Sequence, residues 1–151
     1  MALILDRPLT AAGTPERPGQ EEDARLDIVV IFTSASATIA ALKKAGSLAE
    51  SLGLKITLVV PQIVPFPLPL TSPPVLLDFQ EKRFRELAME SPVDVRVQIF
   101  LCRDALETLK RVLTPRSVVI VGGRRRWWPT KETRLARQLR RDHDVIFTET
   151  E

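Results

Sequence analysis

The residues in this chain best suited to chemistry form a basic run that follows a pair of glycines. Gly122–Gly123 end an apolar stretch, and Arg124–Arg126 and Trp127–Trp128 come next. Glycines let backbone amides approach a phosphate closely, and arginine forks onto phosphate oxygens. The pattern predicts an anion-binding loop. The alternatives are a tight exit from a strand and a solvated loop whose tryptophans cover the sheet end or a partner subunit.

The other reactive side chains do not form a catalytic set. Cys102 lies beside Arg103, and a nearby cation can lower the pKa of a thiol; a packed, inert cysteine is the more common alternative. A nucleophile and base would require Ser34 or Cys102 to meet His143, and nothing in the spacing requires that meeting. With a single cysteine and a single histidine, we expect no all-protein zinc site. We therefore expect no enzyme activity.

The apolar pattern predicts an alternation of strands and helices. Strands are expected at residues 26–32, 54–60, 93–101, 117–121 and 145–148. The four helices expected between them are one that ends at Gly53, one that runs from Ser72 as N-cap to Pro92, one that Asp104 opens and Pro115 ends, and Lys131–Arg141. Such alternation favours right-handed crossovers and an α/β fold with a doubly wound, five-stranded parallel sheet.

The character of each strand predicts its position in that sheet. Strand 26–32 is apolar after Asp27 and strand 117–121 is apolar from Val118 onward, which is typical of central strands. Strand 93–101 alternates in polarity and is expected at an edge or with one face in water. The strand order 3-2-1-4-5 satisfies this pattern. Ligands bind at the carboxyl ends of the strands at the topological switch point, here between strands one and four. The residues expected at this site are Thr33, Ser34, Gly122, Gly123, Arg124, Arg125 and Arg126.

Two segments interrupt the pattern. Residues 1–24 contain prolines, glycines and acids, and we expect a flexible leader before a single domain at 25–151. Residues 61–74 hold six of the 12 prolines and are expected to form an extended apolar loop, either a cover for the sheet end or a lid or partner-binding strip.

Charge and composition limit the class of protein. The net charge of +3 conceals a local charge of +7 over residues 124–141, which leaves a mildly acidic body. No apolar run is long enough to span a membrane, and no signal peptide is recognisable. With its lone cysteine, the chain is expected to be cytoplasmic. Membrane-surface binding is disfavoured because the narrow apolar face of the last helix is needed by the sheet.

Two runs of sequence carry a resemblance to a known family. DIVVIFTSASATIAALKKAGSLAESLGLKITLVVP, residues 27–61, and the stretch 95–123, which ends in CRDALETLKRVLTPRSVVIVGG, resemble universal stress protein domains. The resemblance covers residues 26–149 and rests on element order and apolar pattern. It implies a Rossmann-like regulatory or binding domain, a nucleotide ligand such as ATP or AMP, and a homodimer that pairs through the last strand.

The nucleotide motif of that family is degenerate here. Nucleotide-binding members carry an aspartate after strand one, where this chain has Thr33. They also carry Gly-x-x-Gly, nine residues, then Gly-Ser or Gly-Thr after strand four. This chain keeps the first glycine, but Arg125 or Arg126 stands at the second and Leu135 or Ala136 at the third. We expect arginines to hold the anion in place of glycine amides.

Three functions compete on these observations. The first is a non-catalytic domain that binds a nucleotide or another small phosphorylated ligand. The second is a nucleic-acid-binding accessory module that uses the arginine–tryptophan loop and the basic last helix. The third, a nucleotide-activating enzyme, ranks last because the TSASA segment after strand one has neither a lysine nor paired glycines.

Overall fold

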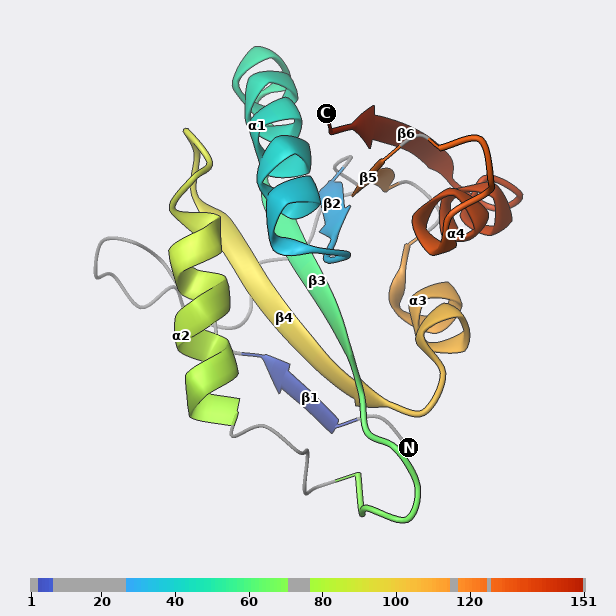
Figure 1. Cartoon of the computed structure of the whole chain (residues 1–151). Helices are drawn as coiled ribbons and strands as arrows, with labels where there is room; N and C mark the ends of the chain where they lie inside the picture. Colours follow the sequence, from blue (N-terminus) through green and yellow to red (C-terminus); the bar gives the residue numbers. More distant parts are fainter. Residues whose placement is uncertain (1–2, 7–26, 71–76, 115–116, 125, 151) are drawn as a thin grey trace.

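The centre of the molecule is one twisted six-stranded sheet (Figure 1). The computed structural model describes residues 3–6, 27–70, 77–114, 117–124 and 126–150. The strands are β1 (Leu3–Asp6), β2 (Ile28–Ile31), β3 (Ile56–Ile63), β4 (Val95–Cys102), β5 (Val118–Gly123) and β6 (Asp144–Glu149). Their spatial order is β1-β4-β3-β2-β5-β6. Strands β2 to β6 are parallel, which confirms the predicted five-stranded sheet and its 3-2-1-4-5 order.

The strand β1 was not predicted from the sequence. It runs antiparallel to β4, with Leu3 opposite Leu101 and Asp6 opposite Gln98. The expectation of a flexible leader therefore does not hold for residues 3–6, where three apolar residues and Asp6 form a short strand by pairing with a distant partner. The rest of the expected leader, 1–2 and 7–24, lies outside the described residues. Strand β4 was expected at an edge, and this expectation is wrong because β1 pairs along its outer side.

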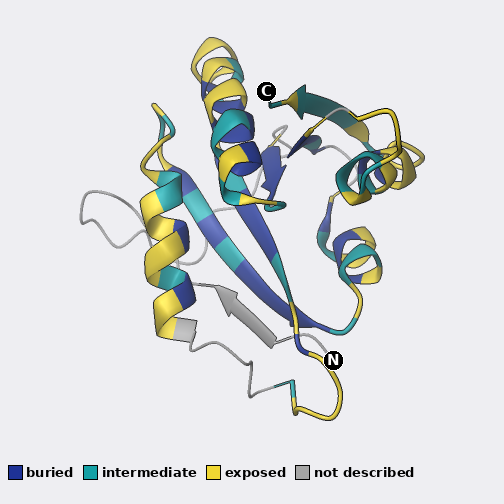
Figure 2. Cartoon of the chain, in the orientation of Figure 1, coloured by how far each residue is buried: buried dark blue, intermediate teal, exposed yellow. Residues whose placement is uncertain are grey.

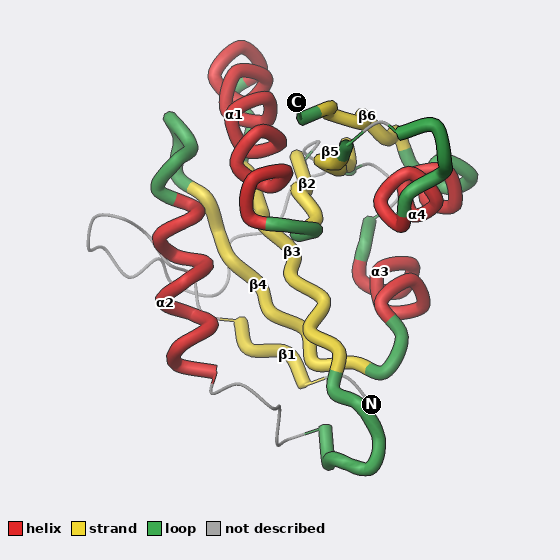
Figure 3. The backbone as a smooth tube through the Cα atoms, in the orientation of Figure 1, coloured by secondary structure: helices red, strands yellow, loops and turns green. Residues whose placement is uncertain are grey.

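Helices cover both faces of the sheet (Figure 3). They are α1 (Ala35–Leu52), α2 (Leu77–Ala88), α3 (Ala105–Val112) and α4 (Lys131–Leu139). Helices α1 and α2 pack on one face and α3 and α4 on the other. Since successive strand side chains point to opposite faces, Val30 packs with the α1 side while Val29 and Ile31 pack with the α3 side. This is the predicted doubly wound arrangement.

Strand β2, one of the two strands predicted as central, is buried along its whole length (Figure 2). Ile28, Val30 and Ile31 are at most 1% exposed, and Val29 is 7% exposed. Burial on both faces requires apolar side chains at consecutive positions, which is why β2 shows no alternation in its sequence.

The two ends of α1 follow from single residues. Ser34 is the N-cap, and its Oγ accepts a hydrogen bond from the backbone N–H of Ala37 at 3.4 Å. Gly53 ends the helix with a φ of 65°, the left-handed conformation that glycine adopts without strain. Leu52, in the last turn of α1, is 63% exposed.

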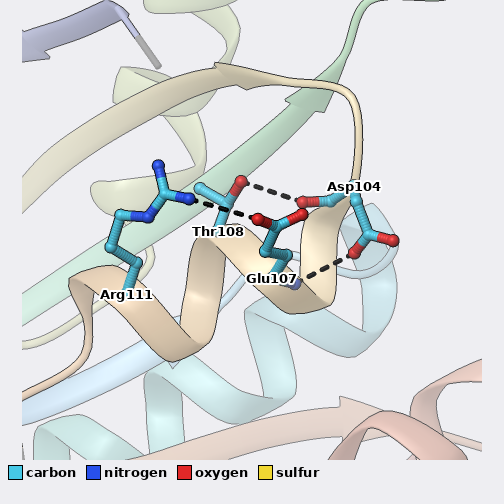
Figure 4. Close-up of polar contacts among 4 residues, drawn as sticks. All are labelled: Asp104, Glu107, Thr108 and Arg111. Carbon is cyan, nitrogen blue, oxygen red and sulfur yellow. Dashed lines mark hydrogen bonds and ion pairs between the residues drawn. The ribbon is translucent and has the colours of Figure 1, made fainter. Parts of the chain in front are cut away.

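Helix α3 is opened by Asp104 as its N-cap, as predicted, with half of a capping box (Figure 4). Asp104 Oδ1 accepts from the backbone N–H of Glu107 at 2.9 Å, and Thr108 Oγ1 donates to the Asp104 carbonyl at 2.8 Å. The Glu107 carboxylate is instead paired with Arg111 at 3.2 Å. One carboxylate therefore caps the helix, while the other makes an exposed pair within it.

Strand β3 runs three residues beyond its predicted end and passes through Pro61. The carbonyls of Lys55 and Val59 accept from β2, so residues at odd positions in β3 face β2. Strand β2 ends opposite Val59, and the missing N–H of Pro61 therefore falls beyond its last partner. Proline is tolerated in a sheet where no ladder bond is lost.

The proline-rich loop after β3 is fastened to the end of β4 by Arg103. This guanidinium donates from Nη1 to the Val64 carbonyl at 2.6 Å and from Nη2 to the Leu68 carbonyl at 2.7 Å. It also lies 4.0 Å from the centre of the Phe66 ring. The predicted N-cap of the next helix, Ser72, and Pro73 lie outside the described residues.

Candidate functional site

The loops that follow the central strands β2 and β5 begin next to each other at one edge of the sheet. Strand β2 pairs with β5 in parallel, with Ile31 opposite Val121. Just beyond that pair, Thr33 Oγ1 donates to the Gly122 carbonyl at 2.8 Å. The topological switch point therefore lies between these strands, at the position where the sequence placed it.

The amino terminus of α1 faces this switch point. The Thr33 N–H donates to Thr38 Oγ1 at 3.2 Å, which fixes the turn between β2 and α1. The first turn of α1 contains no acidic residue of its own that would offset the positive end of the helix dipole. A helix start of this kind attracts an anion.

The two glycines at the end of β5 are required by packing. A Cβ on Gly122 would collide with the Ala37 carbonyl oxygen and lie 2.7 Å from its carbon. A Cβ on Gly123 would lie 2.9 Å from both Glu132 Cβ and Phe147 Cζ. Both glycines belong to the strand and are buried. The absence of side chains lets α1, α4 and β6 approach the end of β5.

An open cleft of about 390 Å³ lies at this convergence. One side is the start of α1 with Ser34, Ser36 and Ala37, and the other is the β5–α4 loop with Gly123, Arg124 and Arg126. Thr130, Glu132 and Thr150 complete the lining. The volume falls within the ~300–1,000 Å³ range of small-molecule sites.

Some polar groups of the cleft have no partner among the described residues, whereas Ser34 and Thr130 cap helices. Arg124 and Arg126 are exposed, and neither forms an ion pair with another described residue. Glu132 is half-buried and brings one carboxylate to the same space. The Thr150 Oγ1 atom is buried, and no described residue hydrogen-bonds to it. A buried hydroxyl without a partner is costly, so a ligand that reached Thr150 would relieve a desolvation penalty.

The seven residues expected at the site have different places in the structure. Ser34, Gly123, Arg124 and Arg126 line the cleft. Thr33 and Gly122 lie beneath it and hold the ends of β2 and β5 together. Arg125 lies outside the described residues.

Five lining residues were not anticipated from the sequence: Ser36, Ala37, Thr130, Glu132 and Thr150. Thr130 is the N-cap of α4, and its Oγ1 accepts from the Thr133 N–H at 3.2 Å. Thr150 follows β6 and donates its N–H to the Gly123 carbonyl at 3.0 Å. Both could have been found from topology, since the carboxyl ends of parallel strands and the helix starts after them share one edge.

The tryptophans of the basic loop point into solvent. Trp127 is 97% exposed and Trp128 is 78% exposed. They therefore do not cover the end of the sheet, which was one of the alternatives for this loop. Only Pro129 separates them from Thr130, the N-cap of α4.

The structure separates the groups that a nucleophile–base pair would need. Ser34 follows the carboxyl end of β2, while His143 precedes the amino end of β6, so they lie at opposite edges of the parallel strands. Burial raises the pKa of the Cys102 thiol, a nearby Asp104 raises it further, and a hydrogen bond to Thr108 opposes both effects. The guanidinium of the adjacent Arg103 instead hydrogen-bonds to carbonyls of the loop after β3, and Cys102 is a buried, packed thiol.

Two further classes of site are not found in the described part of the chain. No three histidine, cysteine or acidic side chains gather there in a way that could hold a metal ion. Among the described helices, none has both the length and the apolar character needed to cross a bilayer.

Comparison with known proteins identifies the fold. No protein-family model and no curated protein matches the sequence. Among solved structures, the universal stress protein from Archaeoglobus fulgidus superposes with a TM-score of 0.55 at 13% identity, covering 82% of this chain and 93% of that chain. The structure of the universal stress protein from Archaeoglobus fulgidus in complex with dAMP gives a TM-score of 0.51 at 12% identity, with coverage of 84% and 98%.

Proposed function

We propose that this chain, which has the fold of the universal stress proteins, is a non-catalytic binding domain for a nucleotide. The observation that carries the proposal is the cleft itself, where the start of α1 faces Arg124 and Arg126 across an open space. A phosphate group fits between them, because the helix dipole and both guanidinium groups favour negative charge. The solved structure with dAMP, which shares this fold, supports the same class of ligand.

The remaining lining favours a nucleotide over a bare phosphate. Glu132 accepts hydrogen bonds and repels phosphate, so it suits a ligand that also carries hydroxyl or amino donors. Ser36 and Thr150 add hydroxyl groups that can donate or accept. A nucleoside phosphate, with an anionic end and a sugar and base, matches both halves of this lining.

The proposal assigns no reaction to the cleft. Its lining contains no cysteine, histidine or lysine. The serines that line it, Ser34 and Ser36, have no histidine among the lining residues to act as their base. We therefore propose that the cleft binds its ligand without reacting with it, and that the bound state itself is the signal.

The experiment is a calorimetric titration with AMP, dAMP, ATP, adenosine and inorganic phosphate. We expect AMP, dAMP or ATP to bind, adenosine to bind more weakly, and the Arg124→Gln/Arg126→Gln variant to lose affinity. Charge-assisted hydrogen bonds contribute about 1.5–3 kcal/mol each, so the loss should be at least about tenfold in Kd.

The matched control is Lys43→Gln/Lys44→Gln, which removes the same charge from two exposed positions in the middle of α1. This control should bind as the unmodified chain does. Equal affinity for adenosine and AMP, or equal losses in both variants, would show that the cleft does not hold the phosphate.

We further propose that two copies pair through β6. Among the described strands, β6 contacts β5 alone and forms one edge of the sheet. Its residues are only half-buried or exposed, and an unpaired edge is a ready template for a second strand. The resemblance to universal stress proteins supports the same arrangement.

A further inference from the structure

The loop before α4 displays two large aromatic rings that the fold does not use. Trp127 and Trp128 are the most exposed large apolar side chains of this region, at 97% and 78%. Neither belongs to either buried cluster of the sheet. Exposed adjacent tryptophans are unfavourable in water, so a surface that presents both indicates a partner.

The outer face of α4 continues this surface as a row of cations. Lys131, Arg134 and Arg137 are spaced by three residues, which places them along one side of the helix over about 9 Å. All three are exposed. None of them forms an ion pair with a described residue, and Ala136 and Leu139 bury the opposite face against the sheet.

We propose that Trp127, Trp128 and this row form a binding surface for single-stranded nucleic acid, distinct from the nucleotide cleft. The complementarity is one of charge and shape. A single strand presents repeated phosphates to the cations and unstacked bases to the indole rings. Rings and cations are contiguous, since Trp128 lies two residues before the N-cap of α4.

An anionic membrane is the other partner with matching charge, and the structure favours it less. An interfacial helix lays its apolar face into the lipid. The apolar face of α4 is already occupied, with Ala136 2% and Leu139 0% exposed. Only the two rings would remain for the lipid, whereas a single strand uses both the rings and the cations.

The test is fluorescence anisotropy of a dye-labelled dT12 oligonucleotide with the full chain, repeated from about 50 to about 200 mM salt. We expect binding that weakens steeply with salt. Trp127→Ala/Trp128→Ala should weaken it about tenfold or more, and Trp127→Phe/Trp128→Phe should restore most of it. Lys131→Gln/Arg134→Gln/Arg137→Gln should lower the salt slope by about 2, because each phosphate contact contributes about 0.7 on a single strand.

Two controls match these variants. Lys43→Gln/Lys44→Gln/Lys55→Gln makes the same change in charge at exposed sites elsewhere, and Phe79→Ala removes another exposed aromatic ring, 63% accessible on α2. Neither control should alter dT12 binding. The Trp127→Ala/Trp128→Ala variant should still bind nucleotides in the cleft, which separates this proposal from the proposed function.

Three results would overturn the proposal. The first is no dT12 binding at low salt by the folded chain. The second is binding that the alanine replacements of both tryptophans leave unchanged, since that would be charge attraction without stacking. The third is capture by vesicles of phosphatidylcholine and phosphatidylserine without any binding of dT12, which would identify a membrane surface instead.

Discussion

Gly122 shows how a single residue can hold together both the fold and the cleft. Its missing Cβ is the space that the Ala37 carbonyl occupies, and its own carbonyl accepts from Thr33. The start of α1 therefore rests directly on the backbone of β5. The glycine that suggested a phosphate-binding turn is therefore explained by the close packing of two backbone segments.

We predict that Gly122→Ala destabilises the chain by about 3 kcal/mol, because a methyl group forced into a packed backbone contact is costly. The free energy of unfolding, measured by urea titration with circular dichroism, checks this. Gly53→Ala is the matched control: its φ of 65° is unfavourable, but a Cβ there meets nothing within 4 Å. It should cost only about 1 kcal/mol. Similar losses in the two variants would contradict a steric role for Gly122.

The buried thiol of Cys102 should make the folded state less stable at alkaline pH. Burial, with a smaller contribution from Asp104, raises the pKa of its thiol above that in the unfolded chain. The folded state therefore binds the thiol proton more tightly. Its contribution to stability is complete below the pKa of the unfolded thiol and is lost as the pH rises through the folded value.

We predict that unfolding free energy falls more steeply between about pH 8 and about pH 10 for the unmodified chain than for Cys102→Ala. Lysine titration affects both proteins, so the difference between them isolates the thiol. In addition, the native thiol should react slowly with a disulfide reagent and rapidly in urea. Parallel pH profiles, or rapid reaction in the native state, would show that the thiol is not held protonated by burial.

Among the helices and strands, those whose hydrophobic pattern reflects their burial could be predicted from the sequence. Strand β2 is apolar at every position because both faces are covered, and α3 is opened by an aspartate that caps it. Strand β1 could not be predicted, because its structure comes from pairing with residues 98–101. Thr150 gives no local signal either, but the predicted strand order places the residue that follows β6 at the same edge of the sheet as Gly123.

Arg103 holds the proline-rich loop against the end of β4. We predict that Arg103→Ala increases hydrogen exchange and protease cleavage within residues 63–70, because two carbonyl bonds and the contact with Phe66 are lost. Global stability should fall by no more than about 2 kcal/mol. Arg103→Lys should protect the loop only partly, since an ammonium cannot fork to two carbonyls and stack on a ring together. Unchanged exchange in Arg103→Ala would show that the prolines alone hold the loop.

At the scale of the whole molecule, β6 leaves one set of backbone groups facing outward. Thr150 donates to the Gly123 carbonyl, so residues at even positions in β6 bond to β5. The N–H groups of Val145 and Phe147 therefore point away from β5, toward the side where we propose a second copy.

We predict that the Val145 and Phe147 amides become protected from hydrogen exchange as the protein concentration rises. Sedimentation equilibrium over the same range should show a monomer–dimer transition. The amides of Ile146 and Thr148, which face β5, serve as the internal control and should be protected at every concentration. Outward amides that exchange freely while sedimentation reports a dimer would place the contact elsewhere.

The placement of the chromophores has a practical consequence for all such measurements. The chain has two tryptophans and no tyrosine, and both indoles stand in water on a single loop. Intrinsic tryptophan fluorescence therefore reports the surroundings of residues 127 and 128 and changes little when the sheet unfolds. A denaturation curve followed by that emission would describe one loop, and the backbone signal is needed to see the core.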